Sequence, residues 1–150
     1  MYSTFSNLAK RMNMRTTLLL IDLDKFKSIN DIHGHQAGDK ILKETGRLLL
    51  KIATKNDIAV RLGGDEFLFL ALVQTHKDAQ NLAQRILKDL NTPLTYNAKE
   101  FQIEASIGIS ISDAPNNTLD KLIQVADGNM YQAKEMGGNQ WYFSKSNSID

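Results

Sequence analysis

Apolar residues recur along this chain with two different periods, and the change between them predicts helices alternating with strands. Helical spacing, with one apolar face each, is found over residues 2–13, 39–54, 76–90 and a last helix that begins near residue 119. The continuous apolar run over residues 16–21 is too short for a buried helix. It predicts a central strand that is covered on both faces of a sheet.

Strict alternation over residues 101–112 predicts one long strand, and Trp141-Tyr142-Phe143 predicts a closing edge strand. Two β-prone runs flank Gly63-Gly64, which predicts a tight hairpin because glycine accepts positive φ at both turn positions. We expect a short helix over residues 25–31 and a loop over residues 32–38. These elements predict an α/β fold with a central mixed sheet covered by helices, of the ferredoxin-like or polymerase-palm type.

Two further segments are predicted to be irregular. Residues 113–117 carry loop residues, and the tail after Ser144 is polar.

Composition narrows the class of protein. The chain has 150 residues, which is the size of one domain with one substantial core. Its net charge of +1 gives no basic surface for nucleic acid. The absence of cysteine excludes disulfides and thiolate metal sites and fits a cytoplasmic domain. No apolar run approaches the roughly 18 residues of a membrane span, so we expect no membrane contact by this domain.

Asp22 and Asp65 are the first candidates for functional residues, because each lies at a junction between a predicted strand and a turn. If the two strands are neighbours, these carboxylates converge as hard oxygen ligands for magnesium, completed by substrate phosphates. Such a site serves in-line attack at phosphorus. Two simpler interpretations stay open. Asp22 and Asp24 can cap the next helix, and Asp65-Glu66 can be the polar edge of a turn.

The segment after Asp24 offers groups that suit a nucleotide. Backbone N–H groups around Lys25 and Phe26 can hold a triphosphate at a helix start, with Lys27 as a nearby charge. Asn30 and Asp39 flank a glycine-containing loop and can read the edge of guanine. There is no P-loop sequence. His33 and His35 lack the spacing of a zinc site, which favours loop packing.

The sequence Arg61-Leu62-Gly63-Gly64-Asp65-Glu66-Phe67 resembles the signature of the GGDEF family, the diguanylate cyclases. Four other segments resemble that family in the right order, so the resemblance runs from about residue 15 to residue 143. They are residues 21–31 (Ile-Asp-Leu-Asp-Lys-Phe-Lys-Ser-Ile-Asn-Asp), residues 34–39 (Gly-His-Gln-Ala-Gly-Asp), residues 105–109 (Ala-Ser-Ile-Gly-Ile), and Ala126-Asp127 with Met130-Tyr131-Gln132-Ala133-Lys134.

The resemblance implies a palm fold like that of adenylyl cyclases, which joins two GTP molecules into cyclic di-GMP and releases pyrophosphate. By position, Asp22, the carbonyl of Leu23, and Asp65 would bind Mg²⁺ or Mn²⁺. Asp65 would also help to deprotonate the 3′-hydroxyl, supported by Glu66. The remaining roles implied are guanine recognition by Asn30 and Asp39 with His35 nearby, phosphate stabilisation by Lys27 and Lys134, and room for nucleotide at Gly63 and Gly64.

The resemblance also implies partners. Each domain would hold one GTP, so catalysis would need a homodimer, which can be transient. The C-terminal block resembles that of GGDEF domains fused to a phosphodiesterase (EAL) domain, and we expect fused sensory or phosphodiesterase domains outside this chain.

Three departures from the family pattern affect these expectations. The usual segment before the first helix is missing, so residues 1–150 are expected to be a single GGDEF domain shortened at its N-terminus. The product-inhibition motif Arg-x-x-Asp is replaced by Thr54-Lys55-Asn56-Asp57, which predicts weak grip on the product. Gly138 stands where an arginine that binds triphosphate is usual, and its loss would cost about 1–3 kcal/mol of binding.

Three hypotheses follow. The first is an active diguanylate cyclase that depends on magnesium. The second is a weakly catalytic GTP-binding domain that regulates an adjoining phosphodiesterase domain, favoured by Gly138. The third, a purely structural dimerisation domain, does not need the carboxylates at positions 22, 39, 65 and 66 or the amide of Asn30.

Overall fold

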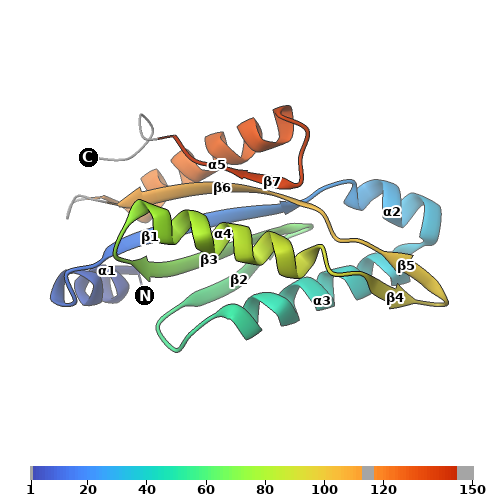
Figure 1. The fold of residues 1–150 in the computed structure, drawn as a ribbon, viewed down its shortest axis with the longest axis horizontal. Helices are drawn as coiled ribbons and strands as arrows, with labels where there is room; N and C mark the ends of the chain where they lie inside the picture. The colour runs from blue at the N-terminus through green and yellow to red at the C-terminus, as the bar shows by residue number, and fades with distance from the viewer. Residues whose placement is uncertain (1, 113–116, 145–150) are drawn as a thin grey trace.

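The computed structural model describes residues 2–112 and 117–144, in which helices cover both faces of one sheet (Figure 1). Four strands of the sheet are antiparallel, and the last joins as a parallel edge, so the sheet is mixed, in the order β2-β3-β1-β6-β7. The elements are α1 (Tyr2–Arg11), β1 (Arg15–Leu23), α2 (Phe26–His33), α3 (His35–Ile52), β2 (Ile58–Gly63), β3 (Glu66–Val73), α4 (His76–Leu90), β4 (Leu94–Tyr96), β5 (Lys99–Phe101), β6 (Ala105–Ser112), α5 (Leu119–Glu135) and β7 (Gln140–Tyr142).

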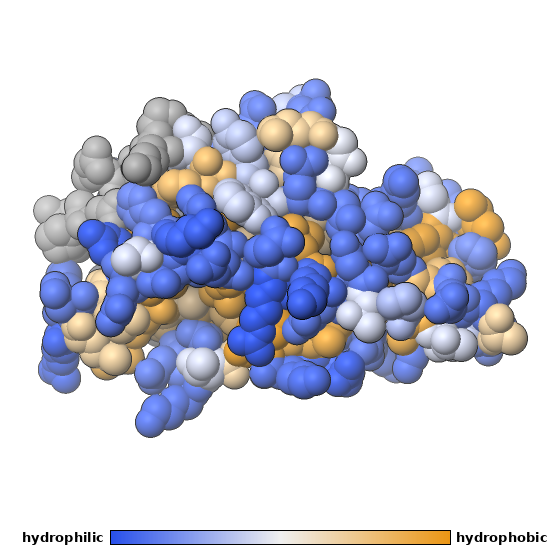
Figure 2. Space-filling view, in the orientation of Figure 1, coloured by the Kyte–Doolittle hydropathy of each residue, from blue (hydrophilic) through white to orange (hydrophobic). Residues whose placement is uncertain are grey.

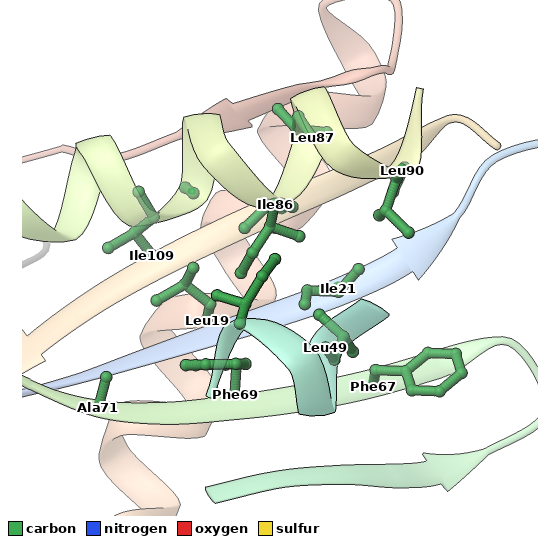
Figure 3. Close-up of a cluster of buried hydrophobic side chains, with 14 of the residues drawn as sticks. Leu19, Ile21, Leu49, Phe67, Phe69, Ala71, Ile86, Leu87, Leu90 and Ile109 are labelled. Carbon is green, nitrogen blue, oxygen red and sulfur yellow. The ribbon is translucent and has the colours of Figure 1, made fainter. Parts of the chain in front are cut away.

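Strand β1 lies in the middle of the sheet and is buried on both faces, as the apolar run predicts. Alternate residues enter different cores, because successive side chains of a strand point to opposite faces. Leu19 and Ile21 join residues of α3 and α4, where Ile86 and Leu49 lie close to them (Figure 3). Leu18 and Leu20 join the apolar residues of α1 and α5 on the other face. In Figure 1, α4 accordingly crosses in front of the sheet and α5 lies behind it.

The predicted helices over residues 2–13, 76–90 and from residue 119 are confirmed as α1, α4 and α5. Helix α4 begins where expected because Thr75 and Asp78 form a reciprocal capping box. Helix α5 packs very closely on β6 at Gly108, where a Cβ would lie 1.9 Å from the carbonyl oxygen of Ala126. That contact explains why a glycine interrupts the larger residues of β6.

The predicted loop over residues 32–38 is wrong. Helix α2 continues to His33 and α3 begins at His35, so only Gly34 separates the two helices. Gly34 has φ of +91°, which a glycine adopts without strain. Gly38, which suggested a loop, lies inside α3. A glycine is needed at this position because a side chain there would collide with Asn30 of α2.

The single strand predicted over residues 101–112 is also wrong. Phe101 pairs with Leu94 in a separate two-stranded sheet, and the main sheet resumes only at Ala105. The alternation persists between them because Ile103 is buried in the same core, although residues 102–104 belong to no strand. The edge strand near the C-terminus is confirmed as β7, without Phe143. The loop predicted at 113–117 falls largely outside the described residues, as does the tail after Ser144.

Hydrophilic side chains cover much of the face that carries α4, with small groups of apolar residues between them (Figure 2). Within the described ranges, no helix combines the length and the apolar character that a membrane crossing requires.

Candidate active site

Acidic side chains meet where β1 ends between β3 and β6. Asp22 of β1 is paired with Glu66 of β3 on one side and with Ser106 of β6 on the other. Directly opposite residues of an antiparallel pair put their side chains on the same face. The backbones of the hairpin and β1 also touch, since the N–H of Leu23 donates to the carbonyl of Asp65 at 3.1 Å. The predicted pairing of the first strand with the hairpin is therefore present, and Asp65 is near enough for its charge to act on Asp22.

The crowding changes the acidity of Asp22. Burial, followed by the charges of Asp65 and Glu66, raises the pKa of Asp22 to about 6, although the hydrogen bond and charge of Lys134 lower it. Nζ of Lys134, in the last turn of α5, lies 3.0 Å from Oδ2 of Asp22. A carboxylate that is partly desolvated among like charges gains from any cation placed beside it.

Asp24 is a junction between three parts of the fold. Its Oδ1 accepts a hydrogen bond from Oγ of Ser106 at 2.7 Å, and its Oδ2 accepts one from the N–H of Asn139 at 2.7 Å. Nζ of Lys134 lies 3.8 Å from Oδ1. Sequence reasoning considered Asp24 only as a helix cap. That interpretation is wrong for Asp22 and Asp24 alike, because the N-cap of α2 is Lys25 and no described side chain caps it.

The hairpin that carries the Gly-Gly-Asp-Glu sequence is confirmed, with one shift. Gly63 still pairs with Glu66, so the two turn residues are Gly64 and Asp65. A bulge between Arg61 and Gly63 causes the shift, because it adds one residue to β2. Both glycines have positive φ, +148° and +53°, and a Cβ at either would meet nothing within 4 Å. The space over the hairpin is therefore open.

The residues expected to recognise guanine lie at the junction of α2 and α3. Oδ1 of Asn30 is buried and has no hydrogen-bond partner among the described residues. An unpaired buried acceptor is costly unless a ligand completes it. His35 and Asp39 are exposed and one turn apart on α3, which places them on one face of that helix. His33 packs edge-on against Phe101, with ring centroids 4.9 Å apart.

The groups expected to hold phosphate surround the start of α2. Lys25 has φ of +58° as the N-cap, and Lys27 is exposed. Phe26 begins the helix and packs partly against the core, which anchors this end of α2. Because the cap supplies no side-chain acceptor, the first N–H groups of α2 stay available to an anion.

The oxygen donors at this place suit a hard divalent cation with open coordination positions. Asp22 and Asp65 offer carboxylate oxygens, and Leu23, the residue directly after Asp22, offers a backbone carbonyl. Within residues 2–112 and 117–144, no three histidine or carboxylate side chains form a complete metal cage. A metal held here would thus need backbone or substrate oxygens as well. The raised pKa of Asp22 and the ammonium of Lys134 beside it both fit a place where a cation is favoured.

A separate cavity of about 430 Å³ lies between the end of α4 and β7. Its amides are already satisfied, because Asn91 and Asn139 donate to each other and Trp141 donates to Gln84. This cavity therefore offers few free polar groups, and the chemistry is concentrated at the end of β1.

Sequence reasoning missed Asp24, Ser106 and Asn139 as one connected group. Ser106 and Asn139 lie 82 and 115 residues from Asp24 along the chain, so no local pattern links them. Their only sequence signal was that each falls in or beside a block that resembles the family.

This chain is similar in sequence and in fold to known proteins of one family. Residues 2–140 match the family model described as "Diguanylate cyclase, GGDEF domain". The chain is 37% identical over 138 residues to the bifunctional diguanylate cyclase/cyclic di-GMP phosphodiesterase MucR of Pseudomonas aeruginosa, covering 92% of this chain and 20% of MucR. It is 33% identical over 132 residues to diguanylate cyclase A of Treponema denticola, covering 87% of this chain and 36% of that protein.

Among solved structures, the GGDEF domain of YfiN from Pseudomonas aeruginosa is similar, with a TM-score of 0.87 and 30% identity. The match covers 95% of this chain and 90% of that domain. The mixed sheet covered by helices is therefore shared with that domain, whereas this chain spans about a fifth to a third of the two curated relatives.

Proposed function

This chain belongs to the GGDEF family of diguanylate cyclases, and from that premise we propose that it condenses two GTP molecules into cyclic di-GMP and releases pyrophosphate. The observation that carries the proposal is that Asp22, Asp65 and Glu66 lie together at the end of β1, where burial and then the charges of Asp65 and Glu66 raise the pKa of Asp22. A scaffold would gain nothing from three carboxylates in one partly buried place.

In the proposed reaction, the 3′-hydroxyl of one GTP attacks the α-phosphorus of the other. A new P–O bond forms, the bond from the α-phosphorus to the β-phosphate bridging oxygen breaks, and pyrophosphate leaves with that electron pair. Asp65, in the turn of the hairpin next to the open space at Gly63 and Gly64, accepts or relays the hydroxyl proton, and Glu66 supports it. The 3′-hydroxyl of the second nucleotide then attacks the α-phosphorus of the first in the same way, which closes the ring and releases a second pyrophosphate.

We expect GTP to be bound at two places, its guanine at the junction of α2 and α3 and its triphosphate at the start of α2. Oδ1 of Asn30 would accept a hydrogen bond from an N–H of guanine, which would remove the cost of leaving that buried acceptor unpaired. Asp39 and His35, exposed on one face of α3, would add contacts to the base. Lys25, Phe26 and Lys27 would place backbone N–H groups and positive charge beside the triphosphate.

Asp22, Asp65 and the carbonyl of Leu23 would hold Mg²⁺ or Mn²⁺. When bound, the metal supplies charge neutralisation at phosphorus and lowers the pKa of the attacking hydroxyl. The protein residues then have to keep both nucleotides in line and exclude competing water.

Two domains face to face are required by this chemistry, because one site holds one GTP and the nucleophile comes from the other. We propose a homodimer that forms during catalysis. Formation of cyclic di-GMP from GTP by an enforced dimer tests the proposal, and Asp65→Ala is expected to abolish it.

A second function is favoured by one observation, namely Gly138 in place of the family's usual arginine. The φ of Gly138 is +75°, and a Cβ there would lie 2.9 Å from Oδ2 of Asp24. A domain without that cation can bind GTP and turn it over slowly while it regulates an adjoining phosphodiesterase domain. MucR, whose name describes both activities, contains a segment similar to this chain.

A further inference from the structure

Lys134 contacts two carboxylates rather than open solvent at the place where substrate phosphates are expected. Its Nζ lies 3.0 Å from Oδ2 of Asp22 and 3.8 Å from Oδ1 of Asp24, and its side chain is 37% exposed. The two carboxylates are less exposed, at 16% and 11%. The ammonium therefore neutralises the acidic end of β1 from the solvent side.

We propose that Lys134 is a built-in counter-cation that competes with the divalent metal for Asp22 and passes to the nucleotide phosphates when the metal binds. The inference rests on the proposed function, because it assigns Asp22 to the metal. Both cations require the same oxygen, and an ammonium 3.0 Å from Oδ2 occupies one side of that carboxylate. A metal ion that enters next to it meets repulsion until Lys134 moves.

Because Asp24 lies next to Asp22, the ammonium of Lys134 has only a short distance to move when it leaves Asp22. Its carboxylate is fixed by Ser106 and by the N–H of Asn139, so its position does not depend on Lys134. When Asp22 binds a metal, Nζ of Lys134 can form its ion pair with Oδ1 of Asp24 instead, which already lies 3.8 Å away. The ammonium then stays at the edge of the site, where a triphosphate can take it up. Asp24 is thus a positioning residue for Lys134.

This exchange couples the two ligands. A nucleotide that attracts Lys134 frees Asp22 for the metal, and a metal on Asp22 releases Lys134 to the nucleotide. Thermodynamic linkage requires the two effects to be equal. The nucleotide-free domain is therefore expected to bind metal weakly, and GTP is expected to strengthen metal binding by more than its own phosphate ligands contribute.

The test measures Mn²⁺ binding by electron paramagnetic resonance, with and without 3′-deoxy-GTP, which lacks the attacking hydroxyl. Lys134→Met is expected to tighten nucleotide-free Mn²⁺ binding by about two- to fivefold, the range for loss of a partly exposed competing ion pair. Its gain in metal affinity on adding nucleotide is expected to shrink by a similar factor. Lys134→Arg keeps the charge and is expected to leave nucleotide-free Mn²⁺ binding weak.

Lys121→Met is the matched control, because it removes the same charge from an exposed position of α5. If Lys121→Met tightens Mn²⁺ binding as much as Lys134→Met, or if Lys134→Met leaves it unchanged, the competition is refuted. Thermal unfolding of each variant checks that the domain is folded. Failure of the wild-type domain to bind Mn²⁺ even with 3′-deoxy-GTP would refute the proposed function as well. If Mn²⁺ binding depends on 3′-deoxy-GTP to the same extent in wild type and in Lys134→Met, this inference alone is refuted.

Discussion

A Cβ at Gly38 would lie 1.9 Å from Oδ1 of Asn30, so the side-chain amide of Asn30 can occupy its place only because residue 38 of α3 is a glycine. Cγ of Asn30 would be 2.8 Å away and Cζ of Phe26 3.1 Å away, so the added methyl group would meet two side chains of α2. The acceptor proposed to read guanine is therefore held in place by a glycine that itself touches no ligand.

Gly38→Ala is expected to displace Asn30 and to weaken GTP binding about tenfold, which corresponds to the loss of a hydrogen bond of about 1.4 kcal/mol. Isothermal titration with GTP measures it. The control is Gly46→Ala in the same helix, where a Cβ would meet nothing within 4 Å, and which is expected to bind GTP normally. Equal affinities for the two variants would contradict the role of Gly38.

Gly108→Ala is expected to destabilise the domain by about 1–3 kcal/mol or more, the usual cost of overpacking a core. The added methyl group would meet backbone atoms of α5, including the amide nitrogen of Met130 at 2.3 Å, and these cannot rotate away. Urea unfolding measures the loss. Gly128→Ala, on α5 with no atom within 4 Å of its Cβ, is expected to keep or raise stability by up to about 1 kcal/mol. A neutral Gly108→Ala would show that α5 can move off β6.

The stability of the metal-free domain is expected to fall as pH rises through about 6, the pKa that burial gives Asp22. The folded pKa is above the ordinary value of 3.8, so the folded state holds a proton that the unfolded state has lost. The stabilisation is complete below the ordinary pKa and is lost above the folded one. Because one pKa unit is about 1.4 kcal/mol and solvent screens part of it, we expect a loss of about 1–2 kcal/mol.

Urea unfolding in EDTA from about pH 4 to pH 7 measures this loss as the difference between wild type and Asp22→Asn, which has no proton to exchange there. A difference that stays constant across this range would show that Asp22 ionises normally in the folded domain.

Added cyclic di-GMP is expected to inhibit this domain only weakly at the position of the family's product site. Thr54 stands where the family has arginine, and its N–H donates to Oδ2 of Asp57 at 2.8 Å, so the turn satisfies that carboxylate by itself. No guanidinium fork is present there to bind guanine or phosphate in two places. Initial rates at several product concentrations measure the effect, and strong non-competitive inhibition would contradict it.

Patterns of local spacing predicted the fold well where burial repeats regularly. The buried run of β1, the capped helix α4 and the helical stripe of α5 all lie where expected, because each buries one defined face. The errors occur where a residue's partner is distant in sequence. Gly38 suggests a loop until its contact with Asn30 is known. Ile103 continues an alternation although it pairs in no sheet.

The candidate site shows the same division. Asp22, Asp65 and Asn30 could be chosen from the sequence, because strand ends, a glycine hairpin and the resemblance to the family all point to them. The attachment of Lys134 and Asn139 to Asp22 and Asp24 could not, since more than a hundred residues separate the partners. Only the fold brings the end of α5 back over the end of β1.

The central claim is tested most directly by cyclic di-GMP formation from GTP and Mg²⁺, with the domain dimerised through a fused leucine zipper and the product identified by mass spectrometry. The account predicts product from the wild-type dimer and none from the Asp65→Ala dimer, whose turn position leaves the folded state intact. No product from a wild-type dimer that binds GTP would contradict the account and favour a regulatory GTP-binding domain.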